Sequence, residues 1–106
     1  MTFYIKQNDT SPSMLATLQD ANGVAVDVTS ATVNFYMGNI NGNVVNSTAT
    51  IVDAEAGQVR YDWVALDTSD SGMYQAEFEV VFIGGVKETF PNSDYISVVI
   101  KPDLQD

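Results

Sequence analysis

The sequence predicts an all-β fold, an antiparallel β-sandwich of seven to eight strands. Apolar and polar residues alternate with a period of two in several short segments, which is typical of strands buried on one face. Turn signals rich in Asn, Gly, Asp and Pro separate these segments at intervals of roughly 8 to 12 residues. No segment shows helical periodicity over three turns, which argues against a mainly helical domain.

The clearest strand lies in the segment Asp67–Phe82, around which the rest of the chain is organised. It opens with a polar turn and continues as a strict alternation rich in β-branched and aromatic residues, which favours a strand over a helix. The inward set consists of Tyr74, Ala76, Phe78, Val80 and Phe82, and the outward set of Gln75, Glu77 and Glu79.

The remaining segments are short and bounded by turns. The other predicted strands are Phe3–Lys6, Met14–Leu18, Val24–Val28, Ala31–Met37, Val44–Val52, Val59–Trp63, Val86–Phe90 and Tyr95–Lys101. Hairpin turns are expected at Asn22-Gly23, Asn41-Gly42 and Gly84-Gly85. Pro91 is expected to mark an edge strand or a change of sheet. We predict that Phe35, Trp63, Phe78 and Phe82 lie in the core.

The second of these turns allows a register test. A two-residue loop at Asn41-Gly42 would set Ile51 opposite Thr32, on the face away from the core. Because Ile51 belongs in the core more plausibly than Thr50, we predict an odd-length loop such as Asn41-Gly42-Asn43, or a nearby bulge.

Length and composition limit the functions that need to be considered. We expect a single domain spanning residues 1–106, with a short tail over residues 102–106. Four Lys and Arg against 14 Asp and Glu give a net charge of −10, which disfavours nucleic acid and anionic membranes as partners. Acidity of this size is also common simply for solubility. With no signal peptide visible, the protein is expected to be made in a cytoplasm.

The residues needed for catalysis are largely missing. The sequence has no histidine and no cysteine, so the usual general base and thiolate nucleophile are absent. Glu77 and Glu79 would lie about 7 Å apart on one strand face, but a sheet face is not a cleft. We therefore predict a protein that is not an enzyme and has no cofactor. Calcium remains a weaker candidate, through Asp67 and Asp70 with Asp9 or Asp94 from another loop.

The turn before the central strand has a recognisable pattern. The segment Asp70-Ser71-Gly72-Met73-Tyr74-Gln75-Ala76 resembles the Asp-x-Gly-x-Tyr-x-Cys signature of immunoglobulin-like (Ig-like) domains, with alanine in place of the cysteine. The resemblance implies an Ig-like sandwich with a tyrosine corner formed by Asp70, Gly72 and Tyr74. In such a corner the tyrosine hydroxyl bonds to the backbone of the preceding turn. A tyrosine that contacts a ligand is the alternative.

A second resemblance covers nearly the whole chain. The segments that carry it are Phe3–Thr10, Leu18–Gly23, Val26–Phe35, Gly57–Trp63, Gly72–Phe78 and Thr89–Asn92. In order and spacing they resemble the N-terminal domain of the tailed-phage baseplate upper protein family. That resemblance implies an Ig-like virion domain that docks onto other virion proteins. Because the sequence ends soon after the predicted sandwich, we expect a module that decorates a capsid or tail, or joins two virion components.

The expected function is therefore structural. We predict a non-enzymatic protein of a tailed-phage virion, located in the baseplate, the tail or the capsid decoration, which binds other virion proteins or further copies of itself as a homo-oligomer. Tyr36, Val81 and Tyr95 point away from the core and are the predicted interface residues. The alternative is a host-surface or carbohydrate-binding attachment module, which would need two or three aromatic side chains exposed together.

Overall fold

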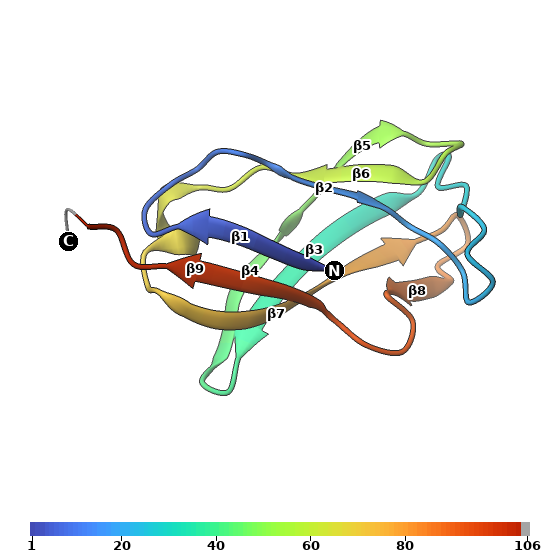
Figure 1. The fold of residues 1–106 in the computed structure, drawn as a ribbon. Helices are drawn as coiled ribbons and strands as arrows, with labels where there is room; N and C mark the ends of the chain where they lie inside the picture. The colour runs from blue at the N-terminus through green and yellow to red at the C-terminus, as the bar shows by residue number, and fades with distance from the viewer. Residues whose placement is uncertain (105–106) are drawn as a thin grey trace.

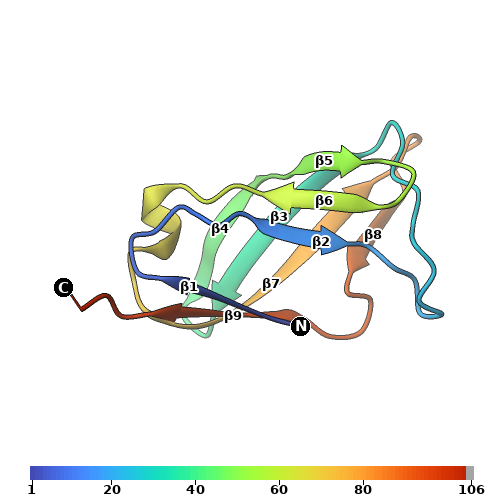
Figure 2. The same ribbon diagram turned by 45° about the horizontal axis from the view of Figure 1, so that its top comes forward.

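The computed structural model describes residues 1–104 as two sheets packed face to face, in an elongated body of 45 × 24 × 23 Å. The six-stranded sheet has the order β1-β9-β7-β3-β4, with β8 also paired to β7. The three-stranded sheet, β2-β6-β5, covers one face of the larger sheet (Figures 1 and 2). The elements are β1 (Thr2–Lys6), β2 (Met14–Thr17), β3 (Thr32–Asn39), β4 (Gly42–Thr48), β5 (Thr50–Asp53), β6 (Gln58–Tyr61), the 3-10 helix η1 (Ala65–Thr68), β7 (Gly72–Val81), β8 (Lys87–Phe90) and β9 (Ile96–Lys101).

The predicted all-β sandwich is confirmed, with two differences in detail. Residues 1–104 form nine strands rather than seven or eight, and β1 pairs with β9 in parallel. Figure 1 shows these first and last strands side by side, with their arrows pointing the same way. Alternation along a strand records which face is buried but not the direction of its neighbour, so the parallel pair was not predictable. Part of the predicted tail, residues 105–106, lies outside the described residues.

Strand β7 is the centre of the larger sheet, as the sequence pattern suggested. β3 pairs with it along one side, from Gly38 opposite Gln75 to Thr32 opposite Val81. On the other side, β9 pairs with its first half and β8 with its second half. The hairpin predicted at Gly84-Gly85 joins β7 to β8, and the break at Pro91 separates β8, an edge strand, from β9.

The segment predicted as one strand, Val44–Val52, is divided between the two sheets. The predicted odd-length loop does not form, because Asn39 pairs with Gly42 and the turn is Ile40-Asn41, one residue earlier than expected. The alternative, a bulge, is present: Met37 pairs with Val45 and Gly38 with Asn43, which leaves Val44 as the extra residue. After β4 the chain crosses at Ala49, and β5 pairs with β6 in the smaller sheet, so the single-strand prediction is wrong. Ile51 is half-buried there and Thr50 is exposed.

The predicted strand Val24–Val28 is also wrong. Only one isolated bridge, Gln19 with Ala25, forms in this region. The amide of Val28 donates instead to the carbonyl of Ala54, and that of Val26 to Leu18, over 2.9 Å each. The segment is therefore a loop whose backbone groups are satisfied one at a time, while Val28 itself is fully buried.

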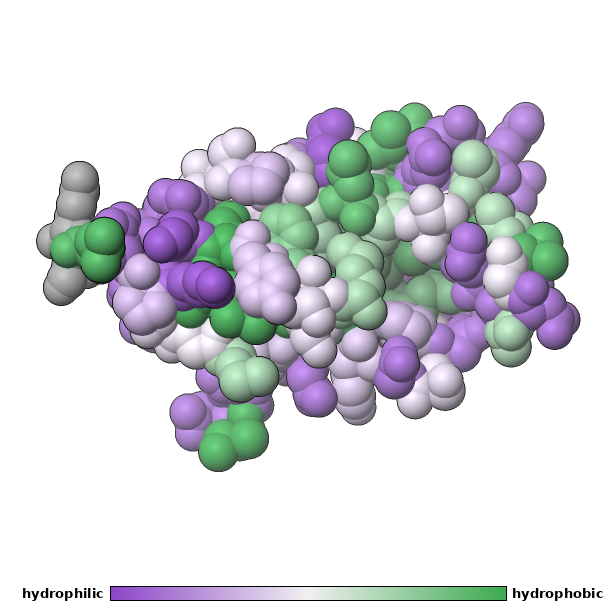
Figure 3. Space-filling view, in the orientation of Figure 1, coloured by the Kyte–Doolittle hydropathy of each residue, from purple (hydrophilic) through white to green (hydrophobic). Residues whose placement is uncertain are grey.

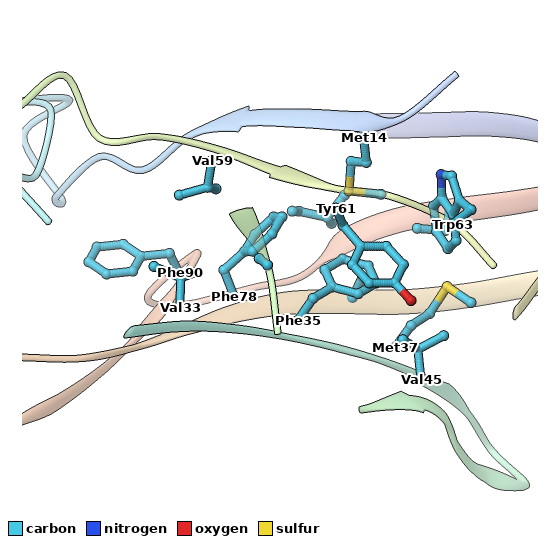
Figure 4. Packing of buried hydrophobic residues seen from close by; sticks show 14 of the residues in the cluster. Met14, Val33, Phe35, Met37, Val45, Val59, Tyr61, Trp63, Phe78 and Phe90 are labelled. Carbon is cyan, nitrogen blue, oxygen red and sulfur yellow. The ribbon is translucent and has the colours of Figure 1, made fainter. Parts of the chain in front are cut away.

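The core between the sheets is centred on Phe35, which comes from the larger sheet. Its ring stacks on Tyr61 from the smaller sheet at 4.2 Å between centroids, and lies 5.1 Å from Phe78 and 5.7 Å from Trp63 (Figure 4). Phe35, Trp63 and Phe78 are buried. Phe82 lies beyond the end of β7 and is only partly buried against the cluster.

Candidate functional site

The candidate site is a row of three side chains across the outer face of the six-stranded sheet. Tyr36 of β3 lies directly opposite Glu77 of β7. On the other side of β7, Ala76 pairs with Ile96, so the preceding residue, Tyr95, comes next to Glu77. We call Tyr36, Glu77 and Tyr95 the tyrosine–glutamate row. Its position follows from the alternation that buries Phe35, Phe78 and Ile96 and turns their neighbours outward.

The tyrosine–glutamate row lines a shallow groove of about 190 Å³. Three amide side chains complete its polar lining, Gln75 from β7 and Asn39 and Asn43 from the β3–β4 hairpin. The bulge at Met37 and Gly38 sets the end of this hairpin, because a Cβ on Gly38 would lie 2.8 Å from the carbonyl oxygen of Gly42. The groove can therefore offer two aromatic rings, one carboxylate and three amides to a ligand.

The two glutamates on this face have different surroundings. Glu79 accepts a hydrogen bond from the Tyr36 hydroxyl at 3.3 Å and a long one from Nδ2 of Asn34 at 3.5 Å. Desolvation of the Tyr36 hydroxyl, followed by the negative charge of Glu79, raises the pKa of Tyr36. Glu77 is half-buried, and within residues 1–104 it has no hydrogen bond or ion pair. Glu77 is thus a carboxylate whose acceptor oxygens are available.

An apolar surface continues from the groove along β7. Ile40, at the tip of the β3–β4 turn, is fully exposed, and Met73 of β7 is 78% exposed. Together with Val99 they line a second shallow depression of about 390 Å³, which shares Asn39 and Gln75 with the first. Figure 3, seen from the side where β1 and β9 lie in front, shows the projecting β3–β4 turn with a hydrophobic tip.

The predicted interface residues fall into two places. Tyr36 and Tyr95 are brought together on either side of Glu77, and Tyr95 is 52% exposed. Val81 lies four residues further along β7, about 13 Å away, where it pairs with Thr32 and Lys87. The alternation along β7 predicts that Glu77 faces outward but not that it lies between two tyrosines, because the neighbours of a strand are set by the sheet order.

The residues of the predicted tyrosine corner also lie together. The hydroxyl of Tyr74 donates a hydrogen bond of 2.8 Å to the backbone carbonyl of Asp70, and Tyr74 is buried. Gly72 between them has a φ of +148°, a conformation that side-chain-bearing residues rarely adopt. Burial, followed by the nearby charge of Asp70, raises the pKa of Tyr74. This arrangement fixes the entry of the chain into β7 and places its outward side chains.

The carboxylates considered for calcium do not converge. Oδ2 of Asp67 accepts hydrogen bonds from the Tyr61 hydroxyl at 2.5 Å and the Val64 amide at 3.0 Å, in a buried position. In the part of the chain that the structure describes, no three side chains from His, Cys, Asp and Glu form a group able to hold a metal ion. Nor does any helix within residues 1–104 have the length and apolar character needed to cross a bilayer.

These observations define a small β-sandwich protein with an uncovered, aromatic sheet face. No protein-family model matches the sequence, and no curated protein matches it. Among solved structures, the chain is similar to CopC from Methylosinus trichosporium OB3b, with a TM-score of 0.54 over 95% of this chain and 84% of that chain. The two sequences are 14% identical over the match, so the similarity concerns the fold alone.

Proposed function

We propose that this chain is a non-enzymatic structural protein of a tailed-phage virion, an Ig-like module that docks onto other virion proteins or onto copies of itself. The order and spacing of sequence segments that resemble the baseplate upper protein family support this proposal, and the sandwich fold agrees with the architecture of that family's N-terminal domain.

The main support for a docking role is the composition of the outer face of β7 and its neighbouring strands. Two tyrosines, Met73 and Ile40 are gathered there, on a sheet face that the smaller sheet leaves uncovered. Tyr and Met are enriched in the centres of protein interfaces, where rigid or adaptable apolar groups exclude water. A surface of this composition favours a role in protein docking over a role in catalysis.

Particle fractionation tests the proposal. Phage particles would be separated into heads and tails by density-gradient centrifugation, and this chain detected in each fraction with a specific antibody. We expect the chain to sediment with one of the two structures, at a constant number of copies per particle. Its recovery only in the soluble fraction of the lysate, away from both heads and tails, would contradict a virion role.

The groove also supports a second candidate, a host-surface or carbohydrate-binding attachment module. Tyr36 and Tyr95 beside three amides form a small polar groove with aromatic walls, a combination that can orient a hydroxyl-rich ligand. Chemical shifts of the groove amides on addition of monosaccharides would distinguish this candidate from protein docking.

A further inference from the structure

We propose that the tyrosine–glutamate row is a receptor site for a single arginine side chain presented by the docking partner. The inference rests on the proposed docking function and names the partner chemistry that the groove fits. It is carried by the position of Glu77 between two tyrosines, by the lack of any cation from the chain itself, and by the charge of the whole molecule.

The geometry of the row suits a planar cation. Glu77 lies between Tyr36, directly opposite on β3, and Tyr95, on the β9 side, and all three line the groove. A carboxylate can accept two parallel hydrogen bonds from a guanidinium group, and tyrosine faces attract the same group through cation–π contact. Because the hydroxyl of Tyr36 is already bonded to Glu79, its ring is held in place before a ligand arrives.

The chain does not supply the cation itself. It has only four cationic side chains. The guanidinium of Arg60 pairs with Asp62 at 2.9 Å on the smaller sheet. Nζ of Lys101 lies 5.3 Å from the ring centre of Tyr4, so a cation already covers that tyrosine of the large sheet. None of the four makes an ion pair with Glu77 in the described residues.

The net charge of the molecule also favours a partner that presents a cationic side chain. A net charge of −10 repels a second copy of this face and accelerates the approach of basic surfaces. Arginine fits better than lysine because its flat, weakly hydrated guanidinium can stack on a ring and bind a carboxylate through two donors at once. The side-chain oxygens of Gln75 and Asn43 can accept the remaining N–H groups, whereas Oδ1 of Asn39 already accepts the Asn41 amide at 2.9 Å.

The test uses the whole chain labelled with 15N and three small probes. N-acetyl-arginine amide is titrated while backbone amide signals are followed by NMR. N-acetyl-citrulline amide, which has nearly the same shape without the charge, and N-acetyl-lysine amide serve as comparison probes. We expect the arginine probe to shift the signals of Gln75, Glu77 and Asn39, with much weaker binding of the other two. Equal binding of the lysine probe, or shifts spread over all acidic loops, would overturn the assignment to arginine.

Matched variants make the test specific to the row. Glu77→Gln is expected to weaken binding of the arginine probe about tenfold, whereas Glu55→Gln, the same charge change in an exposed turn, changes it less than about twofold. Tyr95→Ala should weaken binding, while Tyr4→Ala should not.

Equal effects of the two glutamine variants would overturn the proposal, and so would groove shifts caused by N-acetylglucosamine but not by the arginine probe. If the protein is found in phage particles but does not bind the arginine probe, only this inference is refuted. If it binds the probe but is absent from particles, the virion role is refuted instead.

Discussion

The hydroxyl of Tyr61 donates a hydrogen bond to Oδ2 of Asp67 over 2.5 Å, and both side chains are buried. The bond links the end of β6 to η1, where the chain leaves the smaller sheet for β7 in the larger one (Figure 1). The same oxygen also accepts the Val64 amide at 3.0 Å. A buried carboxylate is tolerated only with such partners, so the pair stabilises the crossover between the sheets.

Removing this hydroxyl should destabilise the protein without disturbing the ring packing. Tyr61→Phe keeps the stack on Phe35 but leaves Asp67 with one donor, which should lower the free energy of unfolding by about 1–3 kcal/mol. Urea denaturation followed by circular dichroism measures the change. Tyr4→Phe, at an exposed tyrosine of β1, is the control and should lie within about 0.5 kcal/mol of the wild type. Equal stabilities of the two variants would show that the buried bond contributes nothing.

The same pair predicts a loss of stability at alkaline pH. Burial, followed by the hydrogen bond to Asp67, raises the pKa of Tyr61 well above its usual value. Its contribution to stability is therefore complete below the unfolded pKa of about 10 and is lost as pH rises from there towards the folded pKa. Thermal unfolding midpoints should fall above about pH 10 in the wild type and fall less steeply in Tyr61→Phe. Parallel profiles for the two proteins would contradict this assignment.

The tyrosine corner should contribute less than the buried pair. Tyr74→Phe removes the bond to the Asp70 carbonyl, but Asp70 is exposed and water can replace the lost donor. We expect a loss of about 0.5–1.5 kcal/mol in the free energy of unfolding, measured by urea denaturation. A loss larger than that of Tyr61→Phe would mean that the corner contributes more to stability than the buried pair.

Much of the fold could be predicted because burial on one face leaves a record in the sequence. The alternation through Phe35 and through Phe78 identified β3 and β7 and the direction of their side chains. The bulge beside Asn43 is one of the two alternatives that the register argument predicts, but the premise of that argument is wrong, because Ile51 pairs with Val59 in the smaller sheet and not with β3. These features depend on residues close together in the chain.

What could not be predicted depends on which strands become neighbours. The crossing at Ala49 and the parallel pairing of β1 with β9 leave no local pattern, since each strand reads the same beside any partner. The candidate site could not be predicted in full for the same reason, because it depends on which strands are neighbours. The alternation predicts that Glu77 faces outward, but its position between Tyr36 and Tyr95 requires the order β9-β7-β3.

The fluorescence of Trp63 offers a direct test of the core. Trp63 is 4% exposed, its ring stacks on Phe3 at 5.7 Å, and its Nε1 is buried without an acceptor in the described residues. We expect emission shifted to the blue of free tryptophan, weak quenching by acrylamide, and no response to added sugars, because the ring lies on the opposite side of the sheet from the groove. Emission like that of tryptophan in water would contradict the sandwich core.

Among the glycines of residues 1–104, Gly57, in the turn before β6, leaves the least room for a side chain. Its φ is +67°, and an added Cβ would lie 2.5 Å from the carbonyl oxygen of Val26 and 2.9 Å from that of Leu18. Gly57→Ala should therefore lower the free energy of unfolding by about 2–5 kcal/mol, through backbone strain together with overpacking. Gly23→Ala is the matched control, because φ there is +79° but nothing lies within 4 Å of the added atom, so only the strain of about 1–2 kcal/mol remains. Urea denaturation of both variants separates overpacking from backbone strain. Equal losses in the free energy of unfolding would show that the loop over residues 18–28 moves aside freely, which would contradict its close packing against Gly57.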